Sequence, residues 1–141
     1  VFSIRVAGNV VNEDVLGSME FACKMAGAKL IVVLGHTECS AIMGACDNLN
    51  IGHLATLFDK IKPSIESEHA TNQNRNSSNP LFVKNVTRLN VHNNIFHIAD
   101  NSSVLAEMIN KGEVGIIGGV YDIKTGEVKF TPMYQSHAIM A

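Results

Sequence analysis

A histidine and a cysteine separated by two residues carry the clearest chemical signal in the sequence. His36 and Cys39 follow the apolar stretch 30–34, and open α/β sheets place ligand sites at the carboxyl ends of such strands. A neutral imidazole and a thiolate are donors that zinc prefers. A catalytic zinc normally has three protein ligands, so this pair predicts a zinc site that needs at least one further donor. Taken alone, the pair also fits a polar loop residue followed by a small buried one.

The other two cysteines are predicted to be structural. Cys23 belongs to an apolar stripe with helical spacing, and Cys46 ends the apolar run 41–46, where a free cysteine is usually buried. An odd number of cysteines outside closely spaced loops favours a reducing compartment with free or metal-bound thiolates. The remaining histidines have no ligand spacing: they are His53, His69, His92, His97 and His137.

The elements that would position the pair alternate between strands and helices. Stretches rich in Val and Ile predict strands, and they are residues 2–6, 30–34, 95–98, 114–120 and 128–130. Alternation with helical segments is typical of a mostly parallel sheet covered by helices on both faces. The fold class is therefore expected to be α/β, with a tight turn at 121–128 in which Gly126 takes a positive φ.

Capping residues and apolar spacing predict four helices. One begins after Asn12 and ends near Gly27, and a second covers 51–65 with a kink at Pro63. Two more begin at Pro80 and Ser103. The polar stretch 69–79 has no periodicity and is expected to be a loop or a disordered connector.

Length and composition indicate one globular domain over residues 1–141. The chain has 46% hydrophobic and 17% charged residues and a net charge of −2, so it has no excess of cations for a nucleic-acid partner. No apolar run approaches the roughly 20 residues of a membrane-spanning helix. We expect a cytoplasmic protein. The chain opens without Met, inside a strand-like run, which predicts that it is incomplete at its N-terminus.

Three segments, in a fixed order, resemble the β-class carbonic anhydrases. They are Arg5-Val6-Ala7-Gly8-Asn9, Gly35-His36-Thr37-Glu38-Cys39, and the stretch from Gly118-Gly119-Val120-Tyr121-Asp122 to Thr125-Gly126-Glu127-Val128. The resemblance covers nearly all of the chain up to Phe130. It implies a zinc-dependent carbonate dehydratase, which interconverts carbon dioxide and bicarbonate by zinc-bound hydroxide, and a homodimer or higher homo-oligomer.

The resemblance also implies roles for individual residues. His36 and Cys39 correspond to two of the three zinc ligands. Phe2, Ala7 and Phe21 correspond to the apolar wall of the carbon dioxide cleft, although plain core packing is an equal alternative for the two phenylalanines. Ser40 stands where the family usually has Gly, next to the metal, and its side chain would narrow or repolarise the pocket.

One family motif has no counterpart in the sequence. The first zinc cysteine of the family lies in a C-x-D-x-R motif whose Asp and Arg orient the reacting group, and this dyad is expected before Val1. We therefore expect no catalytic dyad residue within the chain, and weak or absent activity for this piece alone. The alternatives are a non-catalytic binding or assembly domain, and a related zinc hydrolase acting on carbonyl sulfide or carbon disulfide.

Overall fold

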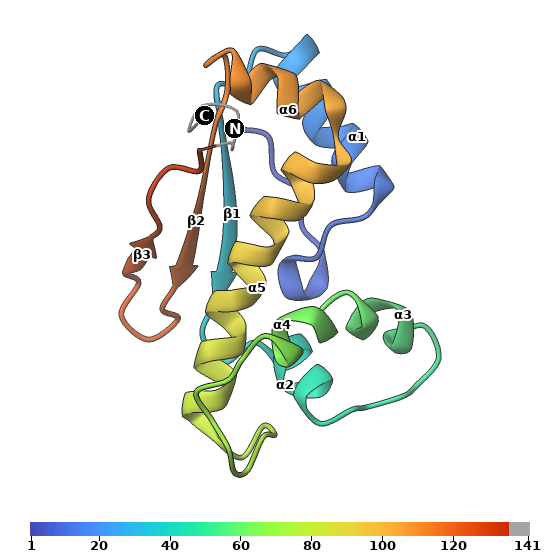
Figure 1. The fold of residues 1–141 in the computed structure, drawn as a ribbon, viewed down its shortest axis with the longest axis vertical. Helices are drawn as coiled ribbons and strands as arrows, with labels where there is room; N and C mark the ends of the chain where they lie inside the picture. The colour runs from blue at the N-terminus through green and yellow to red at the C-terminus, as the bar shows by residue number, and fades with distance from the viewer. Residues whose placement is uncertain (136–141) are drawn as a thin grey trace.

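A three-stranded mixed sheet forms the centre of the fold. In the computed structural model, which describes residues 1–135, β1 (Leu30–His36) pairs in parallel with β2 (Gly115–Tyr121). β2 pairs antiparallel with β3 (Val128–Phe130). The sheet order is β1-β2-β3, and five helices lie between β1 and β2 in the chain (Figure 1). The α/β class is confirmed, with one parallel and one antiparallel pairing.

Helices and helical turns make up most of the rest. A 3-10 turn covers Ala7–Asn9, and α1 continues into a π-helical turn at Phe21–Met25. The helices are α1 (Glu13–Glu20), α2 (Ser40–Cys46), α3 (Leu54–Asp59), α4 (Lys62–Glu66), α5 (Pro80–Asn101) and α6 (Ser103–Asn110). Within residues 1–135, no helix is long and apolar enough to cross a membrane.

Side chains cap the starts of α1, α5 and α6. The Asn12 side chain accepts a hydrogen bond from the backbone N–H of Val15 at 2.9 Å, and Ser102 accepts one from Leu105 at 3.1 Å. Asn79 caps α5, in which Pro80 is the first residue. Each cap satisfies backbone donors that a helix start leaves free. The helices predicted from Asn12, Pro80 and Ser103 are confirmed.

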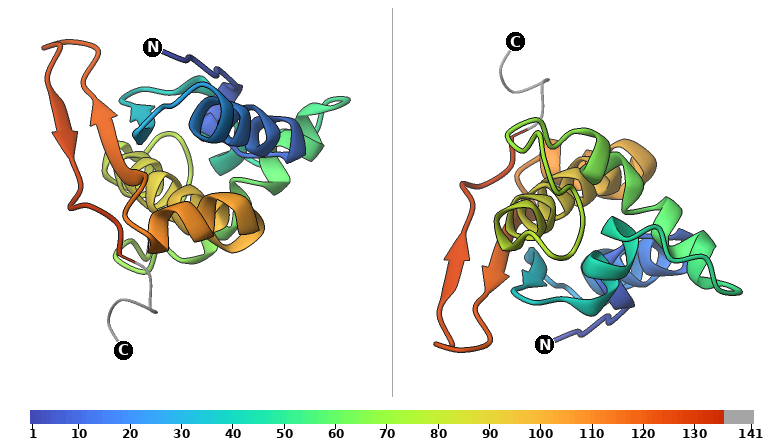
Figure 2. Two further views of the ribbon diagram at one scale, coloured as in Figure 1. Left: turned by 90° about the horizontal axis from the view of Figure 1, so that it is seen from above. Right: turned by 90° about the horizontal axis from the view of Figure 1, so that it is seen from below.

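The two faces of the sheet differ in their cover. Ile31 and Val33 of β1 are buried in a core with α1, α5 and α6, whereas Leu30, Val32 and Leu34 stay 44–47% exposed. Figure 2 shows α5 and α6 on one side of β2 and β3. Helical cover on both faces was therefore wrong for the part of the chain that the structure describes. A second core lies around α2 and the start of α5.

Two predicted strands are not strands. Residues 2–6 have no partner in the three-stranded sheet formed within residues 1–135, and a strand exists only through bonds to a neighbour. Residues 95–98 lie inside α5, where Val91, Ile95 and Ile98 are buried. Their spacing follows one helical face. The apolar residues that predicted a strand are therefore part of the buried side of a 22-residue helix.

The segment predicted as one kinked helix over 51–65 forms two short helices. α3 ends at Asp59 and α4 begins at Lys62. Pro63 occupies the first turn of α4, where the missing N–H of proline has no intrahelical partner to lose. The proline therefore marks a helix start.

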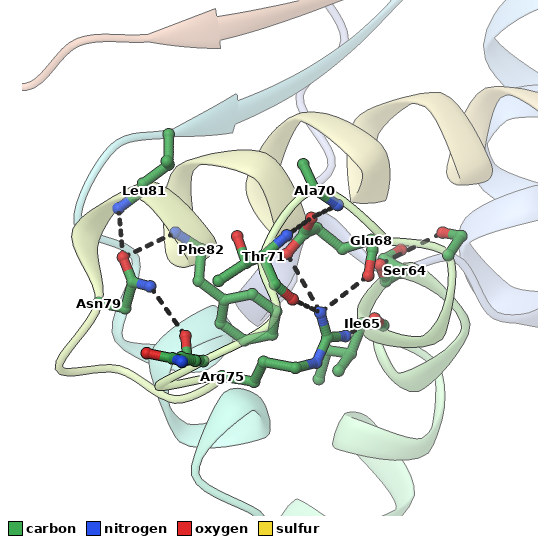
Figure 3. Close-up of polar contacts among 11 residues, drawn as sticks. Ser64, Ile65, Glu68, Ala70, Thr71, Arg75, Asn79, Leu81 and Phe82 are labelled. Atoms are coloured by element: carbon green, nitrogen blue, oxygen red, sulfur yellow. Dashed lines mark hydrogen bonds and ion pairs between the residues drawn. The ribbon is translucent and has the colours of Figure 1, made fainter.

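The polar stretch 69–79 is a loop held by one arginine. The Arg75 guanidinium donates to the backbone carbonyls of Ile65, Glu68 and Thr71 at 2.7–2.9 Å and lies 4.7 Å from the centroid of the Phe82 ring (Figure 3). It also contacts the Glu68 carboxylate, whose side chain is 1% exposed. The loop is thus fastened to α4 and α5.

Candidate metal centre

His36 and Cys39 lie on either side of the turn between β1 and α2. His36 is the last residue of β1 and is exposed, while Cys39 is buried and directly precedes α2. The backbone carbonyl of Cys39 accepts the N–H of Met43 at 3.0 Å, as at a helix start. The turn places an accessible imidazole and a shielded thiol three positions apart in the chain.

A hydrogen bond determines which nitrogen of His36 is free. Nδ1 lies 2.8 Å from the carbonyl oxygen of Thr37. A carbonyl can only accept, so Nδ1 carries the proton and donates it, which leaves the lone pair on Nε2. Histidines that bind a metal through one ring nitrogen commonly donate a hydrogen bond from the other.

The same turn is bonded to the loop between β2 and β3. Thr37 N–H donates to the carbonyl of Tyr121 at 2.9 Å, and the Thr37 hydroxyl oxygen accepts the N–H of Ile123 at 3.1 Å. Glu38 has a positive φ of 54° and forms an ion pair of 3.3 Å with Lys124. None of these contacts was expected from the sequence, because they join segments some 85 residues apart.

The 3-10 turn Ala7–Asn9 lies beside the end of β1. A Cβ added to Gly8 would come within 3.5 Å of Ala41, and one added to Gly35 would come within 3.4 Å of the Asn9 side-chain oxygen. Ala7, assigned to the substrate cleft, is exposed in this turn. The turn therefore lies next to the segment that contains His36 and Cys39.

Two buried asparagines hold this turn, and sequence reasoning missed them. Asn90 Nδ2 donates to the carbonyl of Gly8 at 2.8 Å, and Asn94 Nδ2 donates to the carbonyl of Asn9 at 3.1 Å. Both lie on the buried face of α5. Polar residues four apart among apolar neighbours were the available signal, since a buried amide needs a partner.

Phe2 and Phe21 contact each other but are not core residues. Their ring centroids are 6.0 Å apart, and the side chains are 50% and 55% exposed. Ser40 is exposed as the first residue of α2. The part of these residues in a substrate cleft stays a prediction.

The remaining cysteines are buried, as predicted. Burial raises the pKa of Cys23, and burial together with the nearby Asp47 carboxylate raises the pKa of Cys46 to about 11. Both thiols are therefore protonated at neutral pH and pack as small apolar groups.

His36 and Cys39 fit zinc in donor type but do not complete a site. Across residues 1–135, no three His, Cys, Asp or Glu side chains come together in a group able to hold a metal ion. His137 lies outside the described residues. The described part of the chain supplies an imidazole nitrogen and a sulfur, the two donor types most common in zinc proteins.

The protein has an α/β fold. A histidine and a cysteine, whose side chains are common metal ligands, lie at the carboxyl end of a parallel strand. The family model for carbonic anhydrases matches residues 1–128. The chain belongs to the carbonic anhydrase family, and its β-class resemblance is confirmed.

Curated relatives are similar along most of this chain. Carbonic anhydrase 2 of Mycobacterium tuberculosis is 29% identical over 131 residues, which are 89% of this chain and 60% of that protein. A carbonic anhydrase of Mycolicibacterium smegmatis is 28% identical over 92% of this chain and 62% of that protein. The chain thus spans about three fifths of the length of these relatives.

Solved structures share the fold. A tetrameric β-carbonic anhydrase of Sordaria macrospora superposes with a TM-score of 0.77 at 23% identity, over 95% of this chain and 70% of that one. A β-carbonic anhydrase of Aspergillus fumigatus has a TM-score of 0.77 at 22% identity, over 97% and 66%. At these identities the likeness supports the architecture.

Proposed function

We propose that this chain is part of a zinc-dependent carbonate dehydratase, with His36 and Cys39 as two of its three zinc ligands. One observation carries the proposal: the carbonyl of Thr37 keeps the imidazole proton of His36 on Nδ1. Nε2 is then free to bind a metal, and the thiol of Cys39 follows three positions further along the chain. Membership of the carbonic anhydrase family supplies the reaction.

The two side chains have distinct tasks in this function. His36 would bind zinc through Nε2 and Cys39 through its sulfur as a thiolate. When bound, zinc makes water a nucleophile near neutral pH, which is the chemistry that hydration of carbon dioxide requires. Burial of Cys39 shields its sulfur from bulk water.

The third zinc ligand and the Asp–Arg dyad are proposed to precede Val1. No group of three potential metal ligands occurs within residues 1–135, whereas a catalytic zinc site normally has three protein ligands. Residues 1–141 alone should therefore bind zinc weakly and hydrate carbon dioxide slowly.

The remaining contributions concern substrate and assembly. Phe2, Ala7 and Phe21 offer exposed apolar surface to carbon dioxide, a molecule without net charge, and the hydroxyl of Ser40 adds a polar group at the start of α2. We propose a homodimer or higher homo-oligomer, because the half-exposed Leu30, Val32 and Leu34 form an apolar sheet face. Three buried, unpaired cysteines fit a cytoplasmic location.

The experiment compares residues 1–141 with the longest natural form of the protein. Zinc per chain is measured by mass spectrometry of metals, and carbon dioxide hydration by stopped flow. His36→Ala and Cys39→Ala in the longer form should each lower zinc content well below one per chain and abolish hydration. His53→Ala and Cys46→Ala are the matched controls, since His53 is exposed outside the turn and Cys46 is as buried as Cys39.

Full zinc content in both Ala variants would refute the ligand assignment. A longer form that binds no zinc and shows no hydration would instead favour a non-catalytic carbonic-anhydrase-like domain. The observation that favours this second candidate is that no three potential metal ligands come together within residues 1–135.

A further inference from the structure

Thr37 uses all three of its polar groups to join His36 to the hairpin between β2 and β3. Its carbonyl oxygen accepts the Nδ1 proton of His36 at 2.8 Å. Its backbone N–H donates to the carbonyl of Tyr121 at 2.9 Å, and its hydroxyl oxygen accepts the N–H of Ile123 at 3.1 Å. Thr37 is therefore bonded to the hairpin on two sides and to the imidazole on a third.

The hairpin is itself well defined. Asp122 accepts the N–H of Lys124 at 2.8 Å through its side chain, and Gly126, with a φ of 79°, donates its N–H to the carbonyl of Asp122 at 2.8 Å. Figure 1 shows this hairpin at the carboxyl ends of β1 and β2. Because the hairpin has a fixed conformation, its two hydrogen bonds to Thr37 can hold that residue in place.

A second contact joins the same two segments but is weak. Glu38 and Lys124 form an ion pair whose side chains are 55% and 74% exposed. Exposed pairs of this kind contribute at most about 1 kcal/mol. The hydrogen bonds of Thr37, and not this ion pair, must orient the turn.

We propose that Thr37 is a positioning residue, which passes the placement of the β2–β3 hairpin to the imidazole of His36. Holding the Thr37 peptide in place fixes the carbonyl that accepts the Nδ1 proton, and this selects the tautomer with a free Nε2. The effect of Thr37 on zinc affinity rests on the proposed function. Its effect on the tautomer of His36 is independent of that function.

The test substitutes Thr37 in residues 1–141 and in the longest natural form. Thr37→Val keeps the branched shape and removes the acceptor for Ile123 N–H, and Thr37→Ser restores the hydroxyl. Thr125→Val is the matched control, because the Thr125 hydroxyl accepts a hydrogen bond inside the hairpin, from Glu127 N–H at 3.2 Å. Amide spectra verify that each variant is folded.

The first readout is the tautomer of His36 by nitrogen-15 NMR, in zinc-free protein at a pH where imidazole is neutral. The unsubstituted chain, Thr37→Ser and Thr125→Val should hold the proton on Nδ1, and Thr37→Val should populate both tautomers. The second is zinc affinity in the longer form, which Thr37→Val should reduce about tenfold, as loss of partners around a metal ligand typically does.

A proton on Nε2 in the unsubstituted chain would overturn the proposal without any variant, even if Thr37→Val did not fold. A folded Thr37→Val with an unchanged tautomer and zinc affinity would also overturn it. If the tautomer shifts as expected but no form binds zinc, the positioning role stands and the proposed function fails.

Discussion

Asn90 donates a side-chain hydrogen bond to the backbone carbonyl of Gly8 at 2.8 Å, although 82 residues separate them. Asn90 also accepts the hydroxyl of Ser64 at 3.2 Å, and its side chain is fully buried. One amide on α5 thus fastens the Ala7–Asn9 turn and α4, and this turn lies beside the end of β1. A long-range polar contact therefore sets the surroundings of the candidate metal centre.

Asn90→Ala should lower the free energy of unfolding by about 3 kcal/mol. The substitution leaves a buried carbonyl at Gly8 and a buried hydroxyl at Ser64 without this partner, and it creates a small cavity. Urea unfolding followed by circular dichroism measures the change. Asn101→Ala, at the exposed end of α5, should change stability by less than about 0.5 kcal/mol. Equal effects of the two substitutions would contradict the role given to Asn90.

Gly118→Ala should destabilise the fold by about 1–3 kcal/mol through overpacking. A Cβ at this position would come within 2.5 Å of Val91 and 2.9 Å of Ile95, so β2 and α5 would have to move apart. Gly17→Ala should have the opposite effect on stability. Gly17 lies inside α1, and a Cβ added there would have nothing within 4 Å. Thermal unfolding should show Gly17→Ala stabilised by about 0.5–1 kcal/mol. A neutral Gly118→Ala would mean that the sheet and α5 pack more loosely than the structure indicates.

Arg75→Ala should lower stability by about 2 kcal/mol. It removes the donor to three backbone carbonyls and leaves the buried carboxylate of Glu68 without its cation. Arg75→Lys should recover little of this loss, since an ammonium cannot reproduce the fork of a guanidinium. Chemical denaturation compares both with Arg88→Ala, an exposed arginine of α5 that should have almost no effect. Full recovery by Lys would show that charge alone holds the loop.

Asp47 should give stability a specific dependence on acid pH. Two hydrogen bonds from Ser77 hold the pKa of Asp47 below its ordinary value of 3.8. The bond from the Ser77 hydroxyl has the larger effect and the bond from its backbone N–H the smaller. These hydrogen bonds stabilise the charged carboxylate of Asp47. Their contribution to the free energy of unfolding is therefore complete above pH 3.8 and is lost as the pH falls through the lower pKa of the folded state.

Ser77→Ala should therefore raise the pKa of Asp47, as measured by NMR titration of its carboxyl carbon. The stability difference between the variant and the unsubstituted chain should be largest above pH 3.8 and should shrink at lower pH. Ser78→Ala leaves the bonds to Asp47 in place and is the control. A difference that grew on acidification would have the wrong sign for this interpretation.

Local signals in the sequence determined the parts of the fold that depend on neighbours in the chain. Asn12 caps its helix through a residue three positions away, and Gly126 allows the turn before β3. The strand at 30–34 and the His36–Cys39 pair that follows it were also found from the sequence, and ordered motifs predicted the family. These features require only short-range hydrogen bonding or a recognisable pattern of residues.

Only the tertiary structure decided which apolar stretches became strands and how the turn after β1 is held. Residues 2–6 gained no strand partner among the described residues, and 95–98 joined α5, because strand pairing depends on neighbours far away in the chain. The bonds of Thr37 to Tyr121 and Ile123, and of Asn90 to Gly8, have the same origin. A local pattern identifies a side chain that can do chemistry, but its orientation is set by hydrogen bonds between segments that folding brings together.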